Sequence, residues 1–427
     1  MLMYKNLVQN HILVPLDNGL MIPYINFDNA ATTPPLVSVI EEINSFSPYY
    51  SSIHRGVGYK SIVSSDYYER AREIVLKFVA ADTRDNNIAI FVKNTTEAIN
   101  KLSYALEDII QDGIVLVTEM EHHSNILPWR YKYPIDYVRI DEKGRLDLNH
   151  LEYLLKKYMG KVKLVAISGA SNVTGYINPI HNIAKLSHKY GAKILVDGAQ
   201  LVPHHSINMA YPEPIDFLAF SGHKIYAPFG TGVLIGPRSA FMDKMPDEVG
   251  GGTIKLVTKK EVIWGDLPYK EEAGTPNLFG AITLAKSLET LEEIGMENIM
   301  EYERTLTKYA LDKINEIPNI NIYGEPNVED KVSIISFNVN GLDHNQVAMI
   351  LSINGGIGLR NGCFCAQPYV HKLLGTSLED IEELKRNKGL PRPGMVRISF
   401  GMYNDYEEID VFLKLLKQIG DNLEYYN

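Results

Sequence analysis

Short apolar runs alternate with longer amphipathic segments from about residue 66 to about residue 295. Near-continuous apolar runs bounded by turn residues are typical of strands buried on both faces of a parallel sheet, and the segments between them predict covering helices. Helical periodicity is clearest over 95–110 and 177–191. The predicted strands are 88–93, 113–118, 162–168, 192–197, 216–220 and 232–236.

The pattern changes after about residue 278. A long helical region over 278–316 leads to an apolar strand over 332–341, and a later strand is predicted over 395–401 with a C-terminal helix over 406–422. This order of elements predicts a smaller α+β domain behind the first, with a ligand site between the two.

The composition is that of a globular protein large enough for two or three domains: 427 residues, 45% hydrophobic and 22% charged. A formal net charge of −10 argues against a nucleic-acid partner. Cys363 and Cys365 form a CxC pair, which rarely meets disulfide geometry without strain. Without a signal-peptide pattern or a membrane-length apolar run, we expect a cytoplasmic protein with no membrane partner.

Polar clusters follow five of the predicted strands. In open α/β sheets, ligands bind at the carboxyl ends of the strands, so these clusters predict one shared pocket. The clusters are NTTE (94–97), EMEHHSN (119–125), SGASNVTG (168–175), DGAQ (197–200) and SGHK (221–224).

Asp197 ends an apolar strand, and Lys224 lies on a turn between two others. Asp197 is either a helix cap or the partner of a buried cation. An aspartate and a lysine in this relation are what pyridoxal phosphate requires, because the lysine forms a Schiff base and the aspartate keeps the ring nitrogen protonated. A plain salt bridge is the alternative, but it leaves the other clusters unexplained.

Thr95 and Thr96 lie where a strand gives way to a helix, a place suited to a phosphate group. An ordinary threonine N-cap is the alternative. Ser221 and His223 are expected to reach the same anion.

The paired histidines of EHHSN suggest a metal, but neither HExxH nor CxxC spacing accompanies them, so we predict no metal site. A histidine stacked over the cofactor ring fits the strand-end position better. Asn172 and Gln200 are expected to donate to the phenolic oxygen of the ring.

Together these motifs resemble those of the class V, fold-type I pyridoxal-phosphate enzymes, particularly the SufS-like cysteine desulfurases, with selenocysteine lyases as near relatives. The resemblance covers most of the chain in the family's order. Besides the clusters above, it rests on FDNAATTPP (27–35), SSIHRG (51–56), SGHKIYAPFGTGVL (221–234), GGG (250–252), AGTPN (273–277), LRNGCFCAQP (359–368) and VRISFGMYND (396–405).

The resemblance implies fold type I: an α/β large domain with a mostly parallel seven-stranded sheet and a smaller α+β C-terminal domain. We expect an N-terminal arm at 1–25 packed on the small domain, a large cofactor-binding domain at 26–285 and a small domain at 286–427 that carries the cysteine loop. It also implies a homodimer with composite active sites.

For the site, the resemblance implies that Lys224 anchors the cofactor, Asp197 binds its ring nitrogen and His122 stacks on the ring. Thr275 resembles a residue that reaches the phosphate of the neighbouring subunit. Arg397 resembles the arginine that clamps the substrate carboxylate, against the alternative of a surface ion pair. The further expected ligands are Gln200 for the phenolic oxygen, Thr96, Ser221 and His223 for the phosphate, and Arg360 and Asn172 for the substrate.

Cys365 falls on the family's nucleophile, which takes sulfur from cysteine as a persulfide and leaves alanine. Arg360 is a nearby cation that would favour its thiolate form. A small buried hydrophobe is the alternative for this cysteine, and its glycine-containing context argues against that. Cys363 departs from the family pattern. It relays a persulfide, binds a soft metal or has no role, and of these we favour no role. The segment between Cys365 and Arg397 is longer than usual, which puts docking of a SufE-like acceptor in doubt.

The leading hypothesis is therefore a cysteine desulfurase acting on L-cysteine or a related amino acid, with a protein sulfur acceptor. The alternatives are a selenocysteine lyase or another class V enzyme, namely an aminotransferase, an epimerase or a C–S β-lyase. A non-catalytic sulfur-relay scaffold is a third hypothesis, which the presence of Lys224, Asp197, Arg397 and Cys365 in one chain disfavours.

Overall fold

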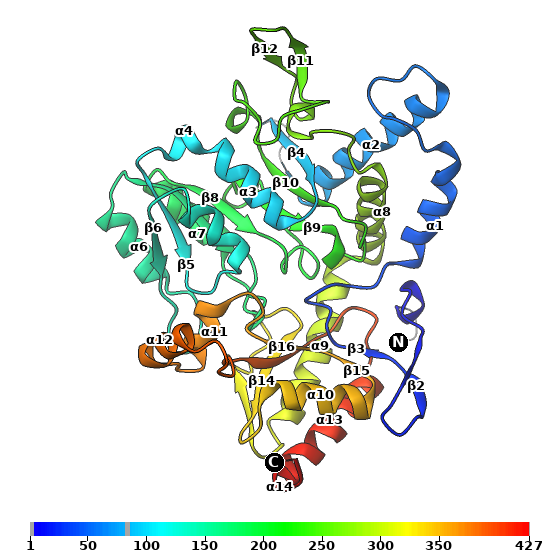
Figure 1. Ribbon diagram of the computed structural model, residues 1–427, viewed down its shortest axis with the longest axis vertical. Helices are drawn as coiled ribbons and strands as arrows, with labels where there is room; N and C mark the ends of the chain where they lie inside the picture. The colour runs from blue at the N-terminus through cyan, green and yellow to red at the C-terminus, as the bar shows by residue number, and fades with distance from the viewer. Residues whose placement is uncertain (1–3, 82–85, 427) are drawn as a thin grey trace.

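The computed structural model describes residues 4–81 and 86–426. One part is built on a large sheet and the other on a smaller one, and both chain termini lie beside the smaller part (Figure 1).

The large sheet has seven strands in the order β4-β10-β9-β8-β7-β5-β6. The strands from β9 to β6 are mutually parallel, whereas β10 runs antiparallel to both of its neighbours. The predicted seven-stranded, mostly parallel α/β sheet is thereby confirmed. In chain order the strands are β4 (Asn87–Val92), β5 (Ile114–Thr118), β6 (Ile135–Val138), β7 (Val162–Ser168), β8 (Lys193–Asp197), β9 (Phe217–Ser221) and β10 (Gly232–Pro237).

Six of these strands match the apolar runs in the sequence, and β6 was missed. It is a short edge strand with only Val138 fully buried, and Asp136 interrupts its apolar character. An edge strand needs no continuous apolar run, so the pattern gave no signal there.

Helices cover both faces of the large sheet and define two apolar cores. One face is covered by α1 (Val37–Phe46), α2 (Tyr59–Phe78), α6 (Leu148–Lys157), α7 (Ile180–Lys189) and α8 (Leu278–Ile294). The other face is covered by α3 (Thr95–Ala105), α4 (Glu107–Ile110) and α5 (Leu127–Arg130).

Two predicted helices are each divided in the structure. The region 95–110 breaks at Leu106 into α3 and α4. The region 278–316 breaks at Gly295, whose φ of 90° suits glycine, into α8 and α9 (Met296–Ile314). The proposed domain limit after residue 285 falls inside α8.

The smaller sheet is antiparallel throughout, in the order β13-β14-β17-β16. Helices α9, α10 and α13 pack against it in a third apolar core. Its elements are β13 (Ile320–Tyr323), β14 (Ile334–Val339), α10 (His344–Gly355), β16 (Arg360–Gly362), β17 (Met395–Ser399), α13 (Tyr406–Asp421) and α14 (Leu423–Tyr426).

The long segment between Cys365 and Arg397 forms α11 (Gln367–Leu373) and α12 (Leu378–Arg386). Ser377 and Asp380 make a reciprocal capping box at the start of α12, and none of its residues is buried. The expected charged, exposed helix is confirmed.

The N-terminal segment lies against the smaller sheet's side of the molecule. A hairpin of β1 (Leu13–Pro15) and β2 (Met21–Pro23) precedes β3 (Ile25–Asn26), which pairs in parallel with β15 (Ile357–Gly358). Lys5 Nζ lies 2.6 Å from Asp405 Oδ2 at the start of α13. Ala30 and Ala31, a few residues after β3, line the pocket described below.

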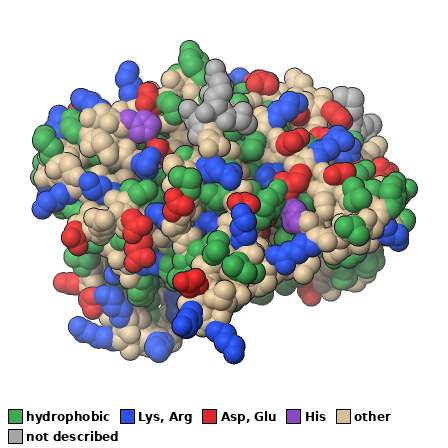
Figure 2. Space-filling model, turned by 90° about the horizontal axis from the view of Figure 1, so that it is seen from above, with side chains coloured by type: hydrophobic (Ala, Val, Ile, Leu, Met, Phe, Trp, Pro, Cys, Tyr) green, Lys and Arg blue, Asp and Glu red, His purple; other side chains and the backbone are tan. Residues whose placement is uncertain are grey.

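A second hairpin, β11 (Ile254–Val257) with β12 (Val262–Trp264), projects from the large-sheet end of the molecule (Figure 1). It exposes the apolar side chains Leu256, Val257, Val262 and Ile263. On the face seen in Figure 2, Lys and Arg side chains are interspersed with Asp and Glu. No described helix combines the length and apolarity needed to cross a membrane.

Candidate active site

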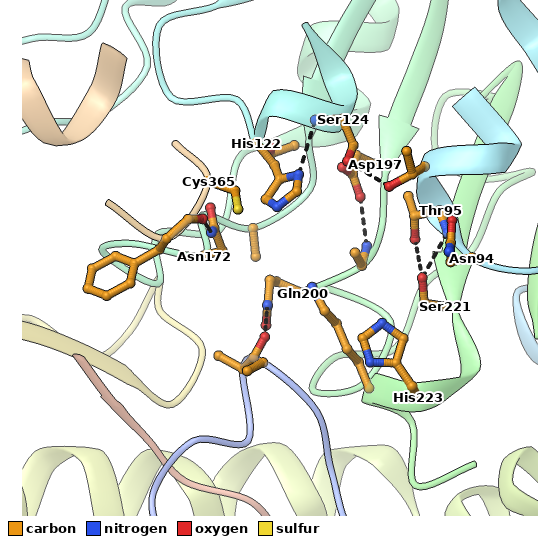
Figure 3. A pocket seen from close by; sticks show the side chains of 18 of the residues that line it. Asn94, Thr95, His122, Ser124, Asn172, Asp197, Gln200, Ser221, His223 and Cys365 are labelled. Atoms are coloured by element: carbon orange, nitrogen blue, oxygen red, sulfur yellow. Dashed lines mark hydrogen bonds between the residues drawn. The ribbon is translucent and has the colours of Figure 1, made fainter. Parts of the chain in front are cut away.

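A cavity of about 320 Å³ lies at the carboxyl edge of the large sheet. Figure 3 shows the labelled side chains gathered around it. Every predicted site residue except Thr275 lines it: Thr95, Thr96, His122, Asn172, Asp197, Gln200, Ser221, His223, Lys224, Arg360, Cys365 and Arg397. The single shared pocket expected from the strand-end clusters is therefore present.

Lys224 ends a one-turn 3-10 segment, η5 (Gly222–Lys224), between β9 and β10. Desolvation lowers the pKa of its amine to about 8, although the negative charge of Asp197 acts in the opposite direction. A large fraction of this amine is therefore neutral near pH 8, as a nucleophile or proton acceptor requires.

Asp197 ends β8 and is only 5% exposed. Its Oδ1 accepts a hydrogen bond of 3.0 Å from Ala199 N in a turn, not a helix, so the helix-cap interpretation is wrong. Burial raises the pKa of this carboxyl, while the Ala199 amide and the charge of Lys224 lower it. The carboxylate thus also faces the pocket as the partner for a cation.

Hydroxyl groups converge at the start of α3. Ser221 Oγ lies 2.8 Å from Thr95 N and 2.6 Å from Thr95 Oγ1. Thr96 Oγ1 lies 2.7 Å from Ser124 Oγ. Backbone amides at a helix N-terminus together with four hydroxyls form a site suited to a phosphate group.

His223 lies beside this cluster, and burial, with the charge of Lys224, lowers its pKa to about 4. It is neutral at physiological pH and can donate or accept a hydrogen bond without adding charge.

The two histidines of EHHSN differ in position and in hydrogen-bond partners. His122 lines the pocket, and burial, followed by the charge of Lys224, lowers its pKa to about 3. Its Nδ1 accepts a hydrogen bond of 3.1 Å from Ser124 N, which leaves the ring neutral with its hydrogen on Nε2. His123 Nε2 instead accepts from Gln367 N at 3.1 Å, at the start of α11.

Glu121 stabilises this turn through side-chain hydrogen bonds. It is fully buried and accepts hydrogen bonds from Ser168 N at 2.9 Å, Ser168 Oγ at 2.7 Å and Asn125 Nδ2 at 2.7 Å. Burial raises its pKa to about 7. The sequence analysis did not single out this residue, because a buried carboxylate satisfied by neutral donors has no local signature.

Cys365 lies on a strained loop. Phe364 and Cys365 have φ angles of 51° and 57°, a conformation that favours glycine. Asn172 Nδ2 donates to Phe364 O at 2.6 Å, and His123 N donates to Cys365 O at 2.7 Å, so the large-sheet part holds the loop in place. Cys365 is exposed, which contradicts the buried-hydrophobe alternative, whereas Cys363 is half-buried against an apolar cluster.

Arg397 is a buried member of β17, with a side chain only 3% exposed. Its NH1 donates to Asn172 O at 2.8 Å, and its guanidinium lies 4.8 Å from the centre of the Phe364 ring. Burial lowers its pKa to about 10, so it stays charged at neutral pH. The surface ion pair considered for this arginine is therefore wrong.

Two expected donors make other contacts in this structure. Gln200 Nε2 donates to Ala30 O at 2.6 Å, and the Asn172 amide is directed at the cysteine loop. Their assignment to the phenolic oxygen of a cofactor stays a prediction.

Thr275 lies outside the pocket. It lines a second cavity of about 730 Å³ together with His54 and Arg55 of the SSIHRG motif and Gly251 and Gly252 of the GGG motif. The expected role of Thr275 toward a neighbouring subunit stays a prediction.

The pocket also contains Asn94, Ser124, Ser168 and Phe364, which sequence reasoning missed. Asn94 is the N-cap of α3 and accepts from Glu97 N, so N-cap preference could have found it. Asp28, which contacts two of the lining arginines, has no local signal beyond its place in FDNAATTPP.

The described residues contain no group of three or more His, Cys, Asp or Glu side chains arranged to hold a metal ion.

Comparisons with known proteins agree with this geometry. A probable cysteine desulfurase of Halalkalibacterium halodurans is 36% identical over 405 residues, covering 93% of each chain. A cysteine desulfurase of Haloferax volcanii is 35% identical over 396 residues, covering 91% of this chain and 87% of the relative. The apo structure of a cysteine desulfurase from Thermococcus onnurineus NA1 superposes with a TM-score of 0.83 at 33% identity, covering 93% of this chain and 95% of that one.

The structural match confirms fold type I of the pyridoxal-phosphate enzymes. The family model for aminotransferase class-V matches residues 25–412, from β3 to α13. With that match and these relatives, the chain belongs to the class-V aminotransferase family.

Proposed function

We propose that this protein is a pyridoxal-phosphate-dependent cysteine desulfurase, which converts L-cysteine to L-alanine and holds the sulfur as a persulfide on Cys365 for transfer to an acceptor. One observation carries the proposal: Lys224, Asp197, Arg397 and an exposed Cys365 line a single cavity. The names of the relatives support the same activity.

The residues present fit the cofactor. Asp197 is a buried carboxylate facing the pocket, and the hydroxyl cluster at the start of α3 provides an anion site in the same pocket. Lys224 would hold the aldehyde carbon, Asp197 the ring nitrogen, and Thr95, Thr96, Ser221 and His223 the phosphate, with the neutral His122 ring against the pyridine. When bound, pyridoxal phosphate supplies a conjugated ring that accepts electrons from the substrate.

The chain's own residues would then act as follows. Arg397 binds the substrate carboxylate through its planar guanidinium, with Arg360 and Asn172 nearby. The Lys224 amine moves the proton at Cα. Cys365 Sγ attacks the substrate sulfur, an S–S bond forms as the bond from sulfur to Cβ breaks, and Cβ takes up a proton to become the methyl group of alanine.

A selenocysteine lyase or another class V enzyme is the alternative; an aminotransferase, epimerase or C–S β-lyase would need Lys224 but not Cys365. The exposed position of Cys365 at the pocket, held by His123 and Asn172, favours desulfuration. The proposal includes a homodimer in which Thr275 faces the active site of the partner subunit. It also includes a cytoplasmic location, which the two free cysteines support.

The test is to incubate the cofactor-loaded protein with L-cysteine and to quantify alanine and sulfide together. With a thiol reductant, we expect equal amounts of both. Without it, we expect alanine and a persulfide that mass spectrometry locates on Cys365. Formation of a keto acid or an inverted stereocentre, with no alanine, would instead support another class V reaction.

The lowered pKa of Lys224 predicts a pH dependence for cofactor uptake. Only the neutral amine reacts with an aldehyde, and its fraction rises as pH rises through the pKa of about 8. We expect the rate at which the apoprotein develops visible absorption with pyridoxal phosphate to rise with pH, with a midpoint near 8. Because Asp197 raises this pKa, Asp197→Asn is expected to move the midpoint lower. A midpoint above 10, as for an exposed lysine, contradicts the prediction.

A further inference from the structure

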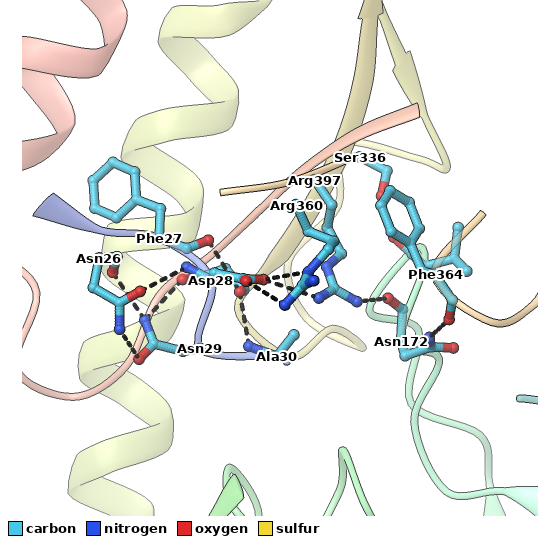
Figure 4. Close-up of polar contacts among 12 residues, drawn as sticks. Asn26, Phe27, Asp28, Asn29, Ala30, Asn172, Ser336, Arg360, Phe364 and Arg397 are labelled. Carbon is cyan, nitrogen blue, oxygen red and sulfur yellow. Dashed lines mark hydrogen bonds and ion pairs between the residues drawn. The ribbon is translucent and has the colours of Figure 1, made fainter. Parts of the chain in front are cut away.

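A carboxylate of the chain itself lies in the arginine cluster that we assign to the substrate. Asp28 Oδ2 lies 2.7 Å from Arg360 NH2, and Asp28 Oδ1 lies 3.3 Å from Arg397 NH2 (Figure 4). Arg360 Nε also donates to Oδ1 at 3.4 Å. Both oxygens of Asp28 are therefore engaged by the two arginines.

The backbone around Asp28 is held independently of those arginines. Asp28 N donates to Asn26 Oδ1 at 3.2 Å, and Asn29 Nδ2 donates to Ser399 O at 2.9 Å. Ala30 N donates to Ser399 Oγ at 2.9 Å. The backbone that carries the Asp28 carboxylate is thus held beside the two arginines by contacts of its own.

Arg397 has N–H donors that no described group of the chain uses. Its NH1 is used by Asn172 O and its NH2 by Asp28, whereas its Nε is buried without a hydrogen-bond partner among the described residues. A carboxylate is best bound by two parallel N–H groups of one guanidinium. An incoming carboxylate that uses Nε and the second hydrogen of the neighbouring NH2 would therefore place its negative charge beside that of Asp28, which accepts from the same NH2.

The charges lead to the same conclusion. Arg360 and Arg397 contribute two positive charges and Asp28 one negative charge, so the cluster offers one net positive charge to one carboxylate. The Arg397 side chain is 3% exposed and Asp28 19%, so water screens their interaction only in part.

We propose that Asp28 limits how tightly substrate and product bind, because its negative charge opposes that of the α-carboxylate at Arg397. This inference rests on the proposed function. It predicts that weaker binding at this site speeds release of the amino-acid product. Two arginines without a neighbouring negative charge would bind alanine more tightly and release it more slowly.

The experiment measures binding without turnover. Propionate and L-alanine are titrated into the cofactor-loaded protein by calorimetry at constant ionic strength, with propionamide as the matched probe that lacks the charge. Asp28→Asn keeps the shape and removes the charge, and it is expected to tighten propionate binding about tenfold while leaving propionamide unchanged. With L-cysteine, the same variant should show a lower KM and stronger inhibition by alanine.

Two further variants, one that removes the net positive charge of the cluster and one that restores it, distinguish the effect of the Asp28 charge from a role of Asp28 in positioning the arginines. Arg360→Ala leaves no net charge and should weaken propionate binding, whereas Asp28→Asn combined with Arg360→Ala restores one positive charge and should return the affinity close to that of the wild type. Weaker propionate binding in Asp28→Asn, or no recovery in the double variant, would overturn the proposal. Because the titrations need no reaction, tighter binding without any alanine from cysteine would refute the desulfurase assignment alone.

Discussion

Lys224→Ala is expected to lower alanine formation from L-cysteine by about 10⁴-fold or more, the upper range for one positioned proton-transfer group. The variant loses both the amine that anchors the cofactor and the group that moves the Cα proton. It should also lack the visible absorption that the wild type acquires with pyridoxal phosphate. We expect no folding effect, because the Lys224 amine is desolvated in the pocket and its removal relieves that cost of burial.

Lys93→Ala is the matched control for this variant. Lys93 lies on the chain just before the same anion site, but its side chain is 71% exposed and only a loose ion pair of 3.9 Å joins it to Glu97. We expect it to retain the wild-type rate and absorption. Measurable turnover in Lys224→Ala at more than a small fraction of the wild-type rate would mean that another group is the anchor.

Cys365→Ala is expected to keep the cofactor's visible absorption and lose sulfide release by at least about 10³-fold, as removal of a nucleophile does. Alanine has a Cβ just as cysteine does, so the strained φ of 57° at this position costs both residues alike. The substitution therefore removes the thiol and little else. Alanine and sulfide are measured together, with mass spectrometry for the persulfide.

Cys363→Ala provides the comparison within the same loop. Cys363 packs against an apolar cluster with Leu373 and Leu374 and is half-buried. We expect this variant to retain turnover, since we favour no catalytic role for Cys363. If sulfide release survives in Cys365→Ala, the nucleophile assignment is wrong; if it is lost in both variants, Cys363 takes part in the transfer.

The positions of six of the seven strands along the chain, and the residues at their ends, could be predicted from the chain alone. A buried parallel strand needs an unbroken apolar run, and each run ends where the chain must turn at the carboxyl edge. Asp197, Ser221 and Lys224 follow such runs, so local pattern was enough to place them in one pocket. The edge strand β6 was not predicted, because an edge position tolerates a charged residue such as Asp136 within the strand.

Contacts between the two parts of the molecule could not be predicted in this way. Asp28 meets Arg360 and Arg397 only because β3 pairs with β15 and the loop after it packs on β17. Which of His122 and His123 is left to line the pocket depends on α11, because the backbone amide of Gln367, the first residue of that helix, donates to the His123 ring. Neither contact has a signature within a few residues of the chain.

The sequence by itself determined the fold class, the strand-end site and its lysine, aspartate and hydroxyl groups, because burial and turn formation are local properties of the chain. Only the tertiary structure decided that Arg397 is buried and shared between Asn172 and Asp28, and that Asn172 and His123 hold the cysteine loop. These contacts join segments far apart in the chain, and they form only when the docking of the two sheets brings the charges and amides within hydrogen-bond distance.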